Sequence, residues 1–510
     1  MLLEMAADGL GERVAFGSRS GGMSFLQLLE RSRRVGAWLA GRPVERVGLV
    51  DVNSPAVPIT LFGAAIAGKP FAPMSYRLAD DRLKATLART APAVVIVGDG
   101  VAERAGDIAG ILPVHRQQLL DRAASEVRHG EGGDASGWLG DPEGVAVLLF
   151  TSGTTGEPKA AVLRHRHLVS YVISTVEFMG AGAEEAALVS VPPYHVAGIS
   201  AILSSVYSGR RVVQLETFEP HAWTITARRE GVTHAMVVPT MLARILDVLE
   251  REGSAVPSLR HLSYGGGRMP APVIERAMTL LPDVDFVNAY GLTETSSTIA
   301  VLDPDDHRAA FASDDPEVSR RLGSVGRPLP TLEVEIRAID GRRAAEGTSG
   351  EIRVRGEQVS GEYLGEDTAL DDGWFATNDA GRLDAGGYLF VEGRIDDVIV
   401  RGGENLSPGE IEEVLLRHPA VADAGVVGLP DREWGEQVAA VVVLNGRGRP
   451  SVTELQDWVR TRLRSARMPA RVEFRAELPY TETGKLLRRV LRDELRNSEP
   501  SHSEQSHSER

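Results

Sequence analysis

The chain has no cysteine among its 510 residues. It therefore cannot form disulfides, bind zinc or iron–sulfur clusters through thiolates, or use a cysteine nucleophile, and any thioester chemistry must use a partner's thiol. Long apolar runs are also missing, because a run such as Val438 to Leu444 has the length of a strand and falls far short of the about 20 residues of a membrane-spanning helix. Residues 1–5 lack the basic segment and apolar core of a secretory signal. We expect a cytoplasmic protein without a membrane span.

Basic residues are outnumbered, with 56 lysines and arginines against 71 acidic residues and a net charge of −15. This balance argues against non-specific binding to nucleic acid. Hydrophobic residues make up 43% and charged residues 25% of the chain, as in ordinary globular proteins. The length allows two or more domains.

The first 390 or so residues alternate short β-branched runs with helical patterns. Val47–Val50 and Val94–Val97 have the composition of buried strands, and Phe25–Leu39 has that of a helix. Such alternation predicts an α/β fold with layered, mostly parallel sheets. Leu332–Ile336 and Glu351–Arg355 instead alternate apolar and polar residues, which predicts half-exposed strands of a small β region.

A second, smaller α+β domain is predicted to begin near Gly393-Arg394. Ser407–Glu410 and Ser451–Glu454 have the spacing of capping boxes that start helices. Ala424–Val427 and Val438–Leu444 are predicted strands of the same unit. The polar end of the chain has the composition of a disordered tail. The predicted units are residues 1–393, residues 394–497 with a mobile character, and the tail 498–510.

A loop rich in hydroxyls and glycine follows the apolar run Val145–Phe150. Its glycines let backbone N–H groups point at an anion, its hydroxyls add donors, and Lys159 adds charge. A Walker A loop needs adjacent glycine and lysine, whereas Lys159 follows Pro158. We predict a phosphate-binding loop of another type, made by Thr151, Ser152, Gly153, Thr154, Thr155, Gly156 and Lys159.

Six further segments follow along the chain. The first is a proline-rich turn that ends in a histidine, the second a triple glycine after a predicted strand, and the third a Tyr-Gly-x-Thr-Glu sequence. The next three are a Gly-Trp segment that ends in aspartate, an arginine and glycine pair at the predicted domain boundary, and a Pro-x-Thr-x-x-Gly-Lys loop near the end. They are Val191–Gly198, Ser263–Gly267, Asn288–Glu294, Gly373–Asp379, Gly393–Asn405 and Leu478–Lys485.

In this order, over about residues 10 to 495, the segments resemble those of the adenylate-forming superfamily, in its acyl- and aryl-CoA synthetase branch. The resemblance implies that Tyr290 stacks on adenine, that Thr293 contacts the α-phosphate and that Glu294 binds Mg²⁺. Gly265 and Gly266 would allow close approach of the nucleotide, with Gly267 and His195 beside an acyl pocket.

The resemblance also assigns residues in the second half of the chain. Asp379 would accept hydrogen bonds from the ribose hydroxyls, although Asn378 stands before it where the superfamily has glycine. Arg394 would contact ribose or phosphate. Asp396 would be the pivot between the domains. The remaining assignments are Gly402 and Gly403 as the lining of a pantetheine channel and Lys485 as the catalytic lysine.

The implied function is ATP- and Mg²⁺-dependent activation of a carboxylic acid as acyl-AMP, followed by transfer to the thiol of CoA. In the same scheme, a carrier-protein thiol or an amine could replace CoA as the acceptor, or another oxyacid such as nitrite could replace the carboxylic acid. A degenerate nucleotide-binding protein is the alternative without catalysis. The motifs leave open which acid is activated and in which oligomeric state the protein works.

Overall fold

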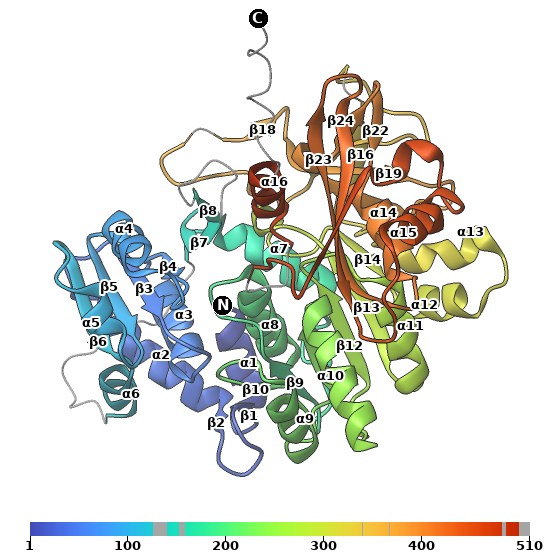
Figure 1. Cartoon of the computed structure of the whole chain (residues 1–510). Coiled ribbons are helices and arrows are strands. Elements are labelled where there is room, and N and C mark those ends of the chain that lie inside the picture. The colour runs from blue at the N-terminus through green and yellow to red at the C-terminus, as the bar shows by residue number, and fades with distance from the viewer. Residues whose placement is uncertain (126–139, 152–158, 339, 367, 482–485, 499–510) are drawn as a thin grey trace, which may run out of the picture.

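The computed structural model describes residues 1–125, 140–151, 159–338, 340–366, 368–481 and 486–498. Two large sheets, each mostly parallel, form the first part of the chain, and two smaller five-stranded sheets form the rest (Figure 1). The predicted α/β fold with a β region and a smaller α+β unit is thereby confirmed.

The six-stranded sheet has the order β6-β5-β3-β4-β7-β8 and is parallel except for its last pair. The nine-stranded sheet has the order β15-β14-β13-β12-β11-β9-β10-β1-β2, with a parallel centre and antiparallel edges. The strands of the first sheet are β3 (Arg46–Val50), β4 (Phe71–Pro73), β5 (Ala93–Val97), β6 (Ile111–His115), β7 (Val145–Thr151) and β8 (Lys159–Arg164). Those of the second are β1 (Val14–Phe16), β2 (Met23–Ser24), β9 (Ala186–Val189), β10 (Arg211–Gln214), β11 (His234–Val237), β12 (His261–Gly265), β13 (Asp285–Tyr290), β14 (Ala300–Leu302) and β15 (Arg327–Pro328).

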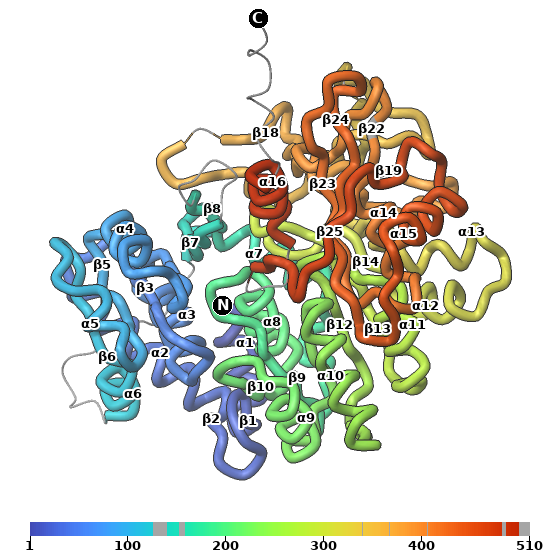
Figure 2. Tube along the Cα trace, in the orientation of Figure 1, coloured from blue at the N-terminus to red at the C-terminus, as the bar shows by residue number. Residues whose placement is uncertain are grey.

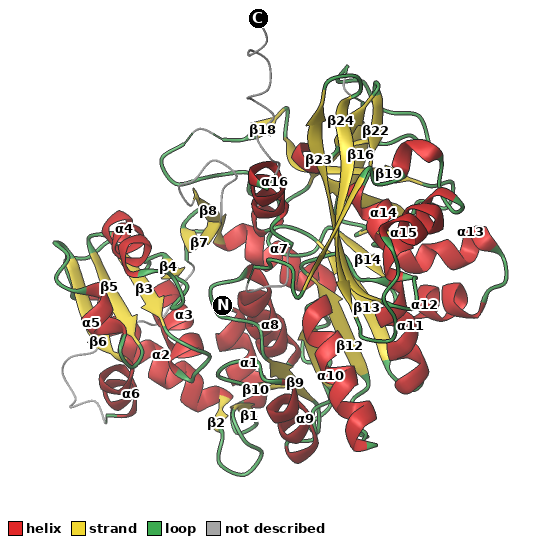
Figure 3. Ribbon diagram, in the orientation of Figure 1, coloured by secondary structure: helices red, strands yellow, loops and turns green. Residues whose placement is uncertain are grey.

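Helices cover both faces of each large sheet and share one layer between them (Figure 3). The shared layer is buried from both sides, and α3 accordingly buries every residue from Ala56 to Ala64, as a helix that is apolar all round must. The shared layer comprises α1 (Leu2–Leu10), α2 (Phe25–Ala40), α3 (Ala56–Ile66) and α8 (Val196–Ser208). The outer layers contain α4 (Asp80–Thr90) and α5 (Val101–Ala105) on one side, and α9 (Pro220–Arg229), α10 (Pro239–Glu252), α11 (Ala271–Leu280) and α12 (Pro304–Ala312) on the other.

The third sheet pairs β16 with β17, and β19 with β17, β18 and β20. The fourth has the order β22-β21-β24-β23, with β25 on β24. The strands are β16 (Glu333–Arg337), β17 (Gly350–Arg355), β18 (Leu370–Asp371), β19 (Trp374–Leu383) and β20 (Leu389–Arg394), then β21 (Ile399–Arg401), β22 (Glu404–Leu406), β23 (Val421–Asp431), β24 (Gly435–Leu444) and β25 (Arg471–Arg475). The remaining helices are α6 (Arg116–Ala124), α7 (His165–Thr175), α13 (Pro316–Ser319), α14 (Pro408–Leu416), α15 (Val452–Arg460) and α16 (Arg488–Asn497), with the 3₁₀ turns η1 (Thr293–Thr295), η2 (Arg320–Gly323), η3 (Ile395–Asp397) and η4 (Ser465–Arg467).

One of the two predicted capping boxes is wrong. Ser451 caps α15, since its hydroxyl accepts from the Glu454 N–H at 3.2 Å and the Glu454 carboxylate accepts from the Ser451 N–H at 2.7 Å. Ser407 makes no cap bond to α14. Its hydroxyl donates instead to the backbone oxygen of Glu392 at 2.7 Å, and so ties α14 to strand β20.

Candidate active site

The ends of the predicted phosphate loop are held together by the antiparallel pair β7 and β8. Thr151 lies opposite Lys159, and the Thr151 hydroxyl donates to the Lys159 carbonyl at 3.3 Å. Residues 152–158, which include the predicted Ser152, Gly153, Thr154, Thr155 and Gly156, lie outside the described residues. The Lys159 ammonium contacts the Glu366 carboxylate at 2.7 Å.

Three of the predicted nucleotide residues form one hydrogen-bonded cluster. The Tyr290 hydroxyl donates to Oδ2 of Asp379 at 2.7 Å, and Arg394 donates to Oδ1 at 3.1 Å. Arg394 also donates to the Thr377 carbonyl at 2.9 Å. Asp379 lies opposite Arg394 in the β19–β20 pair, so the strand register sets the contact between them. Tyr290 and Asp379 lie far apart in the sequence, and only the tertiary fold brings them together.

Burial, reinforced by the neighbouring Asp379 carboxylate, raises the pKa of the Tyr290 phenol well above its ordinary value. The phenol therefore stays protonated and remains a donor to Asp379. Asn378, which precedes Asp379, has a φ of +59°. Asparagine tolerates this left-handed conformation better than most residues, which explains how it can replace the glycine of the superfamily without displacing Asp379.

Glu294 is a buried carboxylate at the turn η1 that follows β13. Its Oε1 accepts a hydrogen bond from the Tyr363 hydroxyl at 2.7 Å, and within the part of the chain that the structure describes it has no ion-pair partner. Thr293 precedes it in the same turn and is half-buried. A buried carboxylate without a cation fits the binding of a metal ion.

The described residues contain no group of three or more histidine, aspartate or glutamate side chains that could hold a metal ion by themselves. Magnesium bound to nucleotides takes one or two carboxylates and completes its octahedron with phosphate oxygens and water. The single carboxylate of Glu294 therefore fits Mg²⁺ that arrives with a nucleotide.

The triple-glycine segment separates into a buried part and an exposed part. A Cβ on Gly265 would lie 2.3 Å from the Ala289 carbonyl oxygen, so this position requires glycine for the close pairing of β12 with β13. Gly266 is exposed with a φ of +77°, and Gly267 is half-buried. The Tyr264 side chain is fully buried and its hydroxyl hydrogen-bonds His307 at 2.8 Å, so it packs in the core rather than facing a pocket.

His195 lies just before α8, and its half-buried ring is 4.7 Å from that of Tyr194. Tyr194 in turn makes an edge contact with Tyr76, with the ring centroids 5.9 Å apart. An aromatic group of this kind is compatible with the predicted wall of an apolar pocket, and the role of His195 stays a prediction.

The glycines of the predicted thiolation loop form the tip of a tight hairpin. Arg401 pairs with Glu404 across it, and Gly402 and Gly403 have φ values of +57° and +82°. Two positive φ angles are what a two-residue hairpin turn needs. The face of Gly402 lies against Trp434, whose ring would meet an added Cβ at 2.9 Å. Figure 1 shows β22 at the top of the molecule, away from β7 and β8.

The predicted pivot, Asp396, is exposed in turn η3 directly after Arg394. The adjacent Asp397 faces two arginines of α16, Arg488 at 3.7 Å and Arg492 at 3.8 Å. Lys485, the predicted catalytic residue, lies outside the described residues. The chain resumes at Leu486, where Tyr480 and Leu486 form an isolated bridge on the two sides of the predicted loop.

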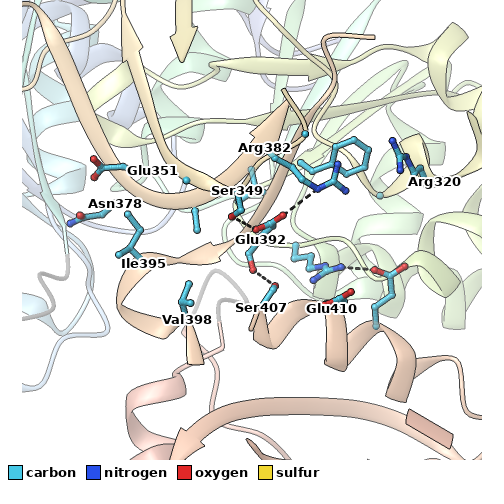
Figure 4. A pocket seen from close by; sticks show the side chains of 18 of the residues that line it. Arg320, Ser349, Glu351, Asn378, Arg382, Glu392, Ile395, Val398, Ser407 and Glu410 are labelled. Carbon is cyan, nitrogen blue, oxygen red and sulfur yellow. Dashed lines mark hydrogen bonds and ion pairs between the residues drawn. The ribbon is translucent and has the colours of Figure 1, made fainter. Parts of the chain in front are cut away.

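A cavity of about 1220 Å³ borders the turn η3 and lies between the third sheet and α14 (Figure 4). Ion pairs line it: Glu392 contacts Arg382 at 3.3 Å, and Glu410 contacts Arg467 at 2.6 Å. The wall includes Asn378 but neither Asp379 nor Arg394. The cavity therefore lies on the opposite side of β19 from the cluster of Tyr290, Asp379 and Arg394.

Three residues that contact the predicted site were not predicted from the sequence. Tyr363 and Glu366 come from the loop after β17, and Trp434 comes from the turn between β23 and β24. Trp434 is 47% exposed, and a tryptophan within the otherwise charged, glycine-containing turn of residues 431–436 is a signal that the sequence could have given. Tyr363 and Glu366 stand in a segment without a recognised motif.

Comparison with known proteins identifies the family of this chain. The chain matches the AMP-binding enzyme family over residues 3–364 and the C-terminal domain of AMP-binding enzymes over residues 410–485. It is 34% identical over 487 residues to a feruloyl-CoA synthase of Amycolatopsis sp, which covers 93% of this chain and 94% of the relative. It is 31% identical to a fatty acid–[acyl-carrier-protein] ligase of Streptomyces coeruleorubidus, over 92% of this chain and 91% of that one.

Among solved structures, o-succinylbenzoate CoA synthetase from Bacillus subtilis superposes over 96% of this chain and 98% of its own, with a TM-score of 0.83 and 29% identity. That protein was solved with its acyl-adenylate intermediate, and also with ATP and a magnesium ion. The chain therefore belongs to the AMP-binding enzyme family. Within it, the chain belongs to the acyl- and aryl-CoA synthetase branch.

In the part of the chain that the structure describes, no helix has both the length and the apolar character needed to cross a membrane. The predicted division at residues 393 and 394 stays a prediction, as does the role of each site residue.

Proposed function

We propose that this enzyme activates a carboxylic acid with ATP as an acyl-adenylate and transfers the acyl group to the thiol of CoA. The observation that carries the proposal is the cluster of Tyr290, Asp379 and Arg394, together with the buried Glu294, which follows Tyr290 by four positions and has no ion-pair partner among the described residues. In the first half-reaction a carboxylate oxygen attacks the α-phosphorus, and pyrophosphate leaves. In the second the CoA sulfur attacks the acyl carbon, loses its proton and displaces AMP.

The residues have the following proposed roles. Asp379 and Arg394 hold the ribose, with the Tyr290 ring beside the base. Glu294 binds Mg²⁺, which would neutralise phosphate charge when bound, and Thr293 contacts the α-phosphate. Lys159 and the loop from Thr151 hold the outer phosphates. Lys485 stabilises the charge that develops in the transition state. Gly402 and Gly403 serve the second half-reaction, after rotation about Asp396.

The masses of the reaction products would identify the acid that the enzyme activates. We would incubate the protein with ATP, Mg²⁺, CoA and a panel of acids, and measure product masses. Ferulate and 2-succinylbenzoate should head the panel, because relatives are named for them. We expect an acyl-CoA together with AMP. AMP and pyrophosphate without a thioester would instead favour a carrier-protein thiol, as in the Streptomyces coeruleorubidus relative, or an amine.

We further propose a cytoplasmic location, where ATP and CoA are supplied.

The first mutational prediction concerns Lys485. Lys485→Ala should slow adenylation by about 100-fold or more, since one transition-state donor is worth about 3 kcal/mol or more. ATP binding should be nearly unchanged, because the lysine acts on charge that develops later. Pyrophosphate exchange measures adenylation and calorimetry measures binding. Lys84→Ala, on the exposed face of α4, is the control, and equal exchange by the two variants would remove Lys485 from the mechanism.

A further inference from the structure

The segment 360–366 is fixed on two elements of the proposed ATP site. The Ser360 N–H donates to the Glu294 carbonyl at 2.8 Å. On the other side, the Leu364 N–H donates to the Ala160 carbonyl at 2.8 Å, and Tyr363 forms a bridge with Ala161. The segment therefore connects turn η1, which carries Glu294, to strand β8, which begins at Lys159.

A half-buried ion pair strengthens the attachment to β8. Glu362 and Arg164 make two parallel contacts, at 2.9 and 2.7 Å, with side chains 26% and 28% exposed. A bidentate arginine–carboxylate pair fixes orientation as well as distance. The backbone on which Tyr363 stands is thereby held against β8 on both sides of the residue.

Tyr363 contacts two charged groups of the proposed ATP site, Glu294 and Lys159. Its hydroxyl donates to Oε1 of Glu294 at 2.7 Å, and its ring lies 5.2 Å from the Lys159 ammonium. Lys159 also contacts Glu366 of the same segment at 2.7 Å. One phenol therefore orients the carboxylate through a hydrogen bond and carries the ammonium on its π face.

The chemistry of magnesium makes the orientation of Glu294 important. Mg²⁺ demands near-ideal octahedral geometry and dehydrates reluctantly. A carboxylate that rotates freely must be immobilised when it binds the ion, and this cost lowers its affinity for Mg²⁺. Tyr363 occupies Oε1, and Oε2 has no hydrogen bond among the described residues. The phenol thus holds the carboxylate in one orientation and leaves one oxygen available.

We propose that Tyr363 is a positioning residue that presents Glu294 to nucleotide-bound Mg²⁺. The inference rests on the proposed function, since it takes Glu294 as the magnesium ligand. Tyr363 itself touches neither metal nor substrate in this role. Its effect should therefore be confined to the magnesium-dependent part of nucleotide binding.

The test is a binding experiment with ATP, with and without Mg²⁺, in the absence of any acid. Calorimetry should show that Mg²⁺ tightens ATP binding to the wild type, and that Tyr363→Phe loses about five- to tenfold of this gain. The affinity for AMP, which needs no metal, should change by less than about twofold. The matched control is Tyr388→Phe, which also removes a tyrosine hydrogen bond to a carboxylate, that of Asp306 at 2.5 Å.

Each outcome has one meaning. A wild type without magnesium-dependent ATP binding contradicts the proposed function. If the wild type behaves as expected but Tyr363→Phe keeps the full magnesium gain, Tyr363 does not position Glu294. Equal losses of AMP and ATP affinity would show a general distortion of the site and also overturn the inference. In a protein that already carries Glu294→Gln, adding Tyr363→Phe should not reduce the magnesium-dependent gain in ATP affinity any further, because both substitutions act through one carboxylate.

Discussion

Asp379 is the residue on which the nucleotide cluster depends, since both of its oxygens receive a donor from another strand. Its side chain is 6% exposed. Asp379→Asn keeps the shape but removes the charge, and hydrogen bonds to a charged group are worth about 1.5–3 kcal/mol. We expect AMP affinity, measured by calorimetry, to fall by about 10- to 100-fold.

The control for Asp379→Asn stands on the same hairpin. Asp384 is also buried, but its carboxylate accepts from the backbone N–H groups of Gly386 and Tyr388. Asp384→Asn should lower stability without changing AMP affinity. Unchanged AMP affinity in Asp379→Asn would place the ribose site elsewhere.

His167 makes the stability of the protein sensitive to acid. It is fully buried behind β8, where its Nδ1 accepts from the Arg164 N–H at 3.1 Å. Burial, followed by the charge of Arg166, lowers the pKa of His167 to about 4. The unfolded chain takes up a proton near pH 6.5, whereas the folded protein does not until about pH 4. The contribution of the neutral ring is therefore complete above pH 6.5 and is lost as the pH falls toward 4.

At pH 5 this loss amounts to roughly 2 kcal/mol of the free energy of unfolding. His167→Asn keeps an acceptor for the Arg164 N–H but cannot titrate. Urea unfolding at pH 7.5 and pH 5 should show a drop in the wild type that is about 2 kcal/mol larger than in the variant. Equal drops would mean that other groups cause the acid sensitivity.

At the scale of elements, α15 and α14 form a matched pair. Both follow a serine with a glutamate three residues later, but only Ser451 caps its helix. Ser451→Ala should cost about 1 kcal/mol and speed amide hydrogen exchange in the first turn of α15. Ser407→Ala should leave exchange at the start of α14 unchanged, since it loses only the contact with Glu392. Faster exchange at both helix starts would contradict the assignment.

The same pair shows where sequence prediction succeeds and where it fails. The capping pattern is local, so it marks a helix start in both cases, but the partner of the serine hydroxyl depends on what packs nearby. Tyr290, Asp379 and Arg394 were predicted for one site through the family resemblance, and the structure brings them together. Tyr363 was missed because its contact with Glu294 spans 69 positions of sequence and belongs to no local pattern.

At the scale of the whole molecule, and apart from Arg394 at the predicted boundary itself, few polar contacts among the described residues join the smaller part to the larger. Arg268 contacts Glu413 of α14, and Ser407 donates to Glu392. Both members of the ion pair are partly exposed, at 40% and 31%, so the pair is worth at most about 1 kcal/mol. Contacts of this strength suit a part that changes orientation between two half-reactions.

Separate half-reactions predict separable mutations. Gly403 and Gly446 both have φ near +80° and nothing within 4 Å of an added Cβ, so leucine at either position costs a similar strain of about 1–2 kcal/mol. Gly403 is the hairpin tip assigned to the thiol channel, whereas Gly446 follows β24. In single-turnover experiments with supplied acyl-AMP and CoA, Gly403→Leu should slow thioester formation by about tenfold or more, and Gly446→Leu should not. Pyrophosphate exchange should be similar in both, because adenylation does not use the hairpin. Equal thioester rates in the two variants would leave Gly402 and Gly403 with a purely structural role, that of the two positive φ angles in a tight turn.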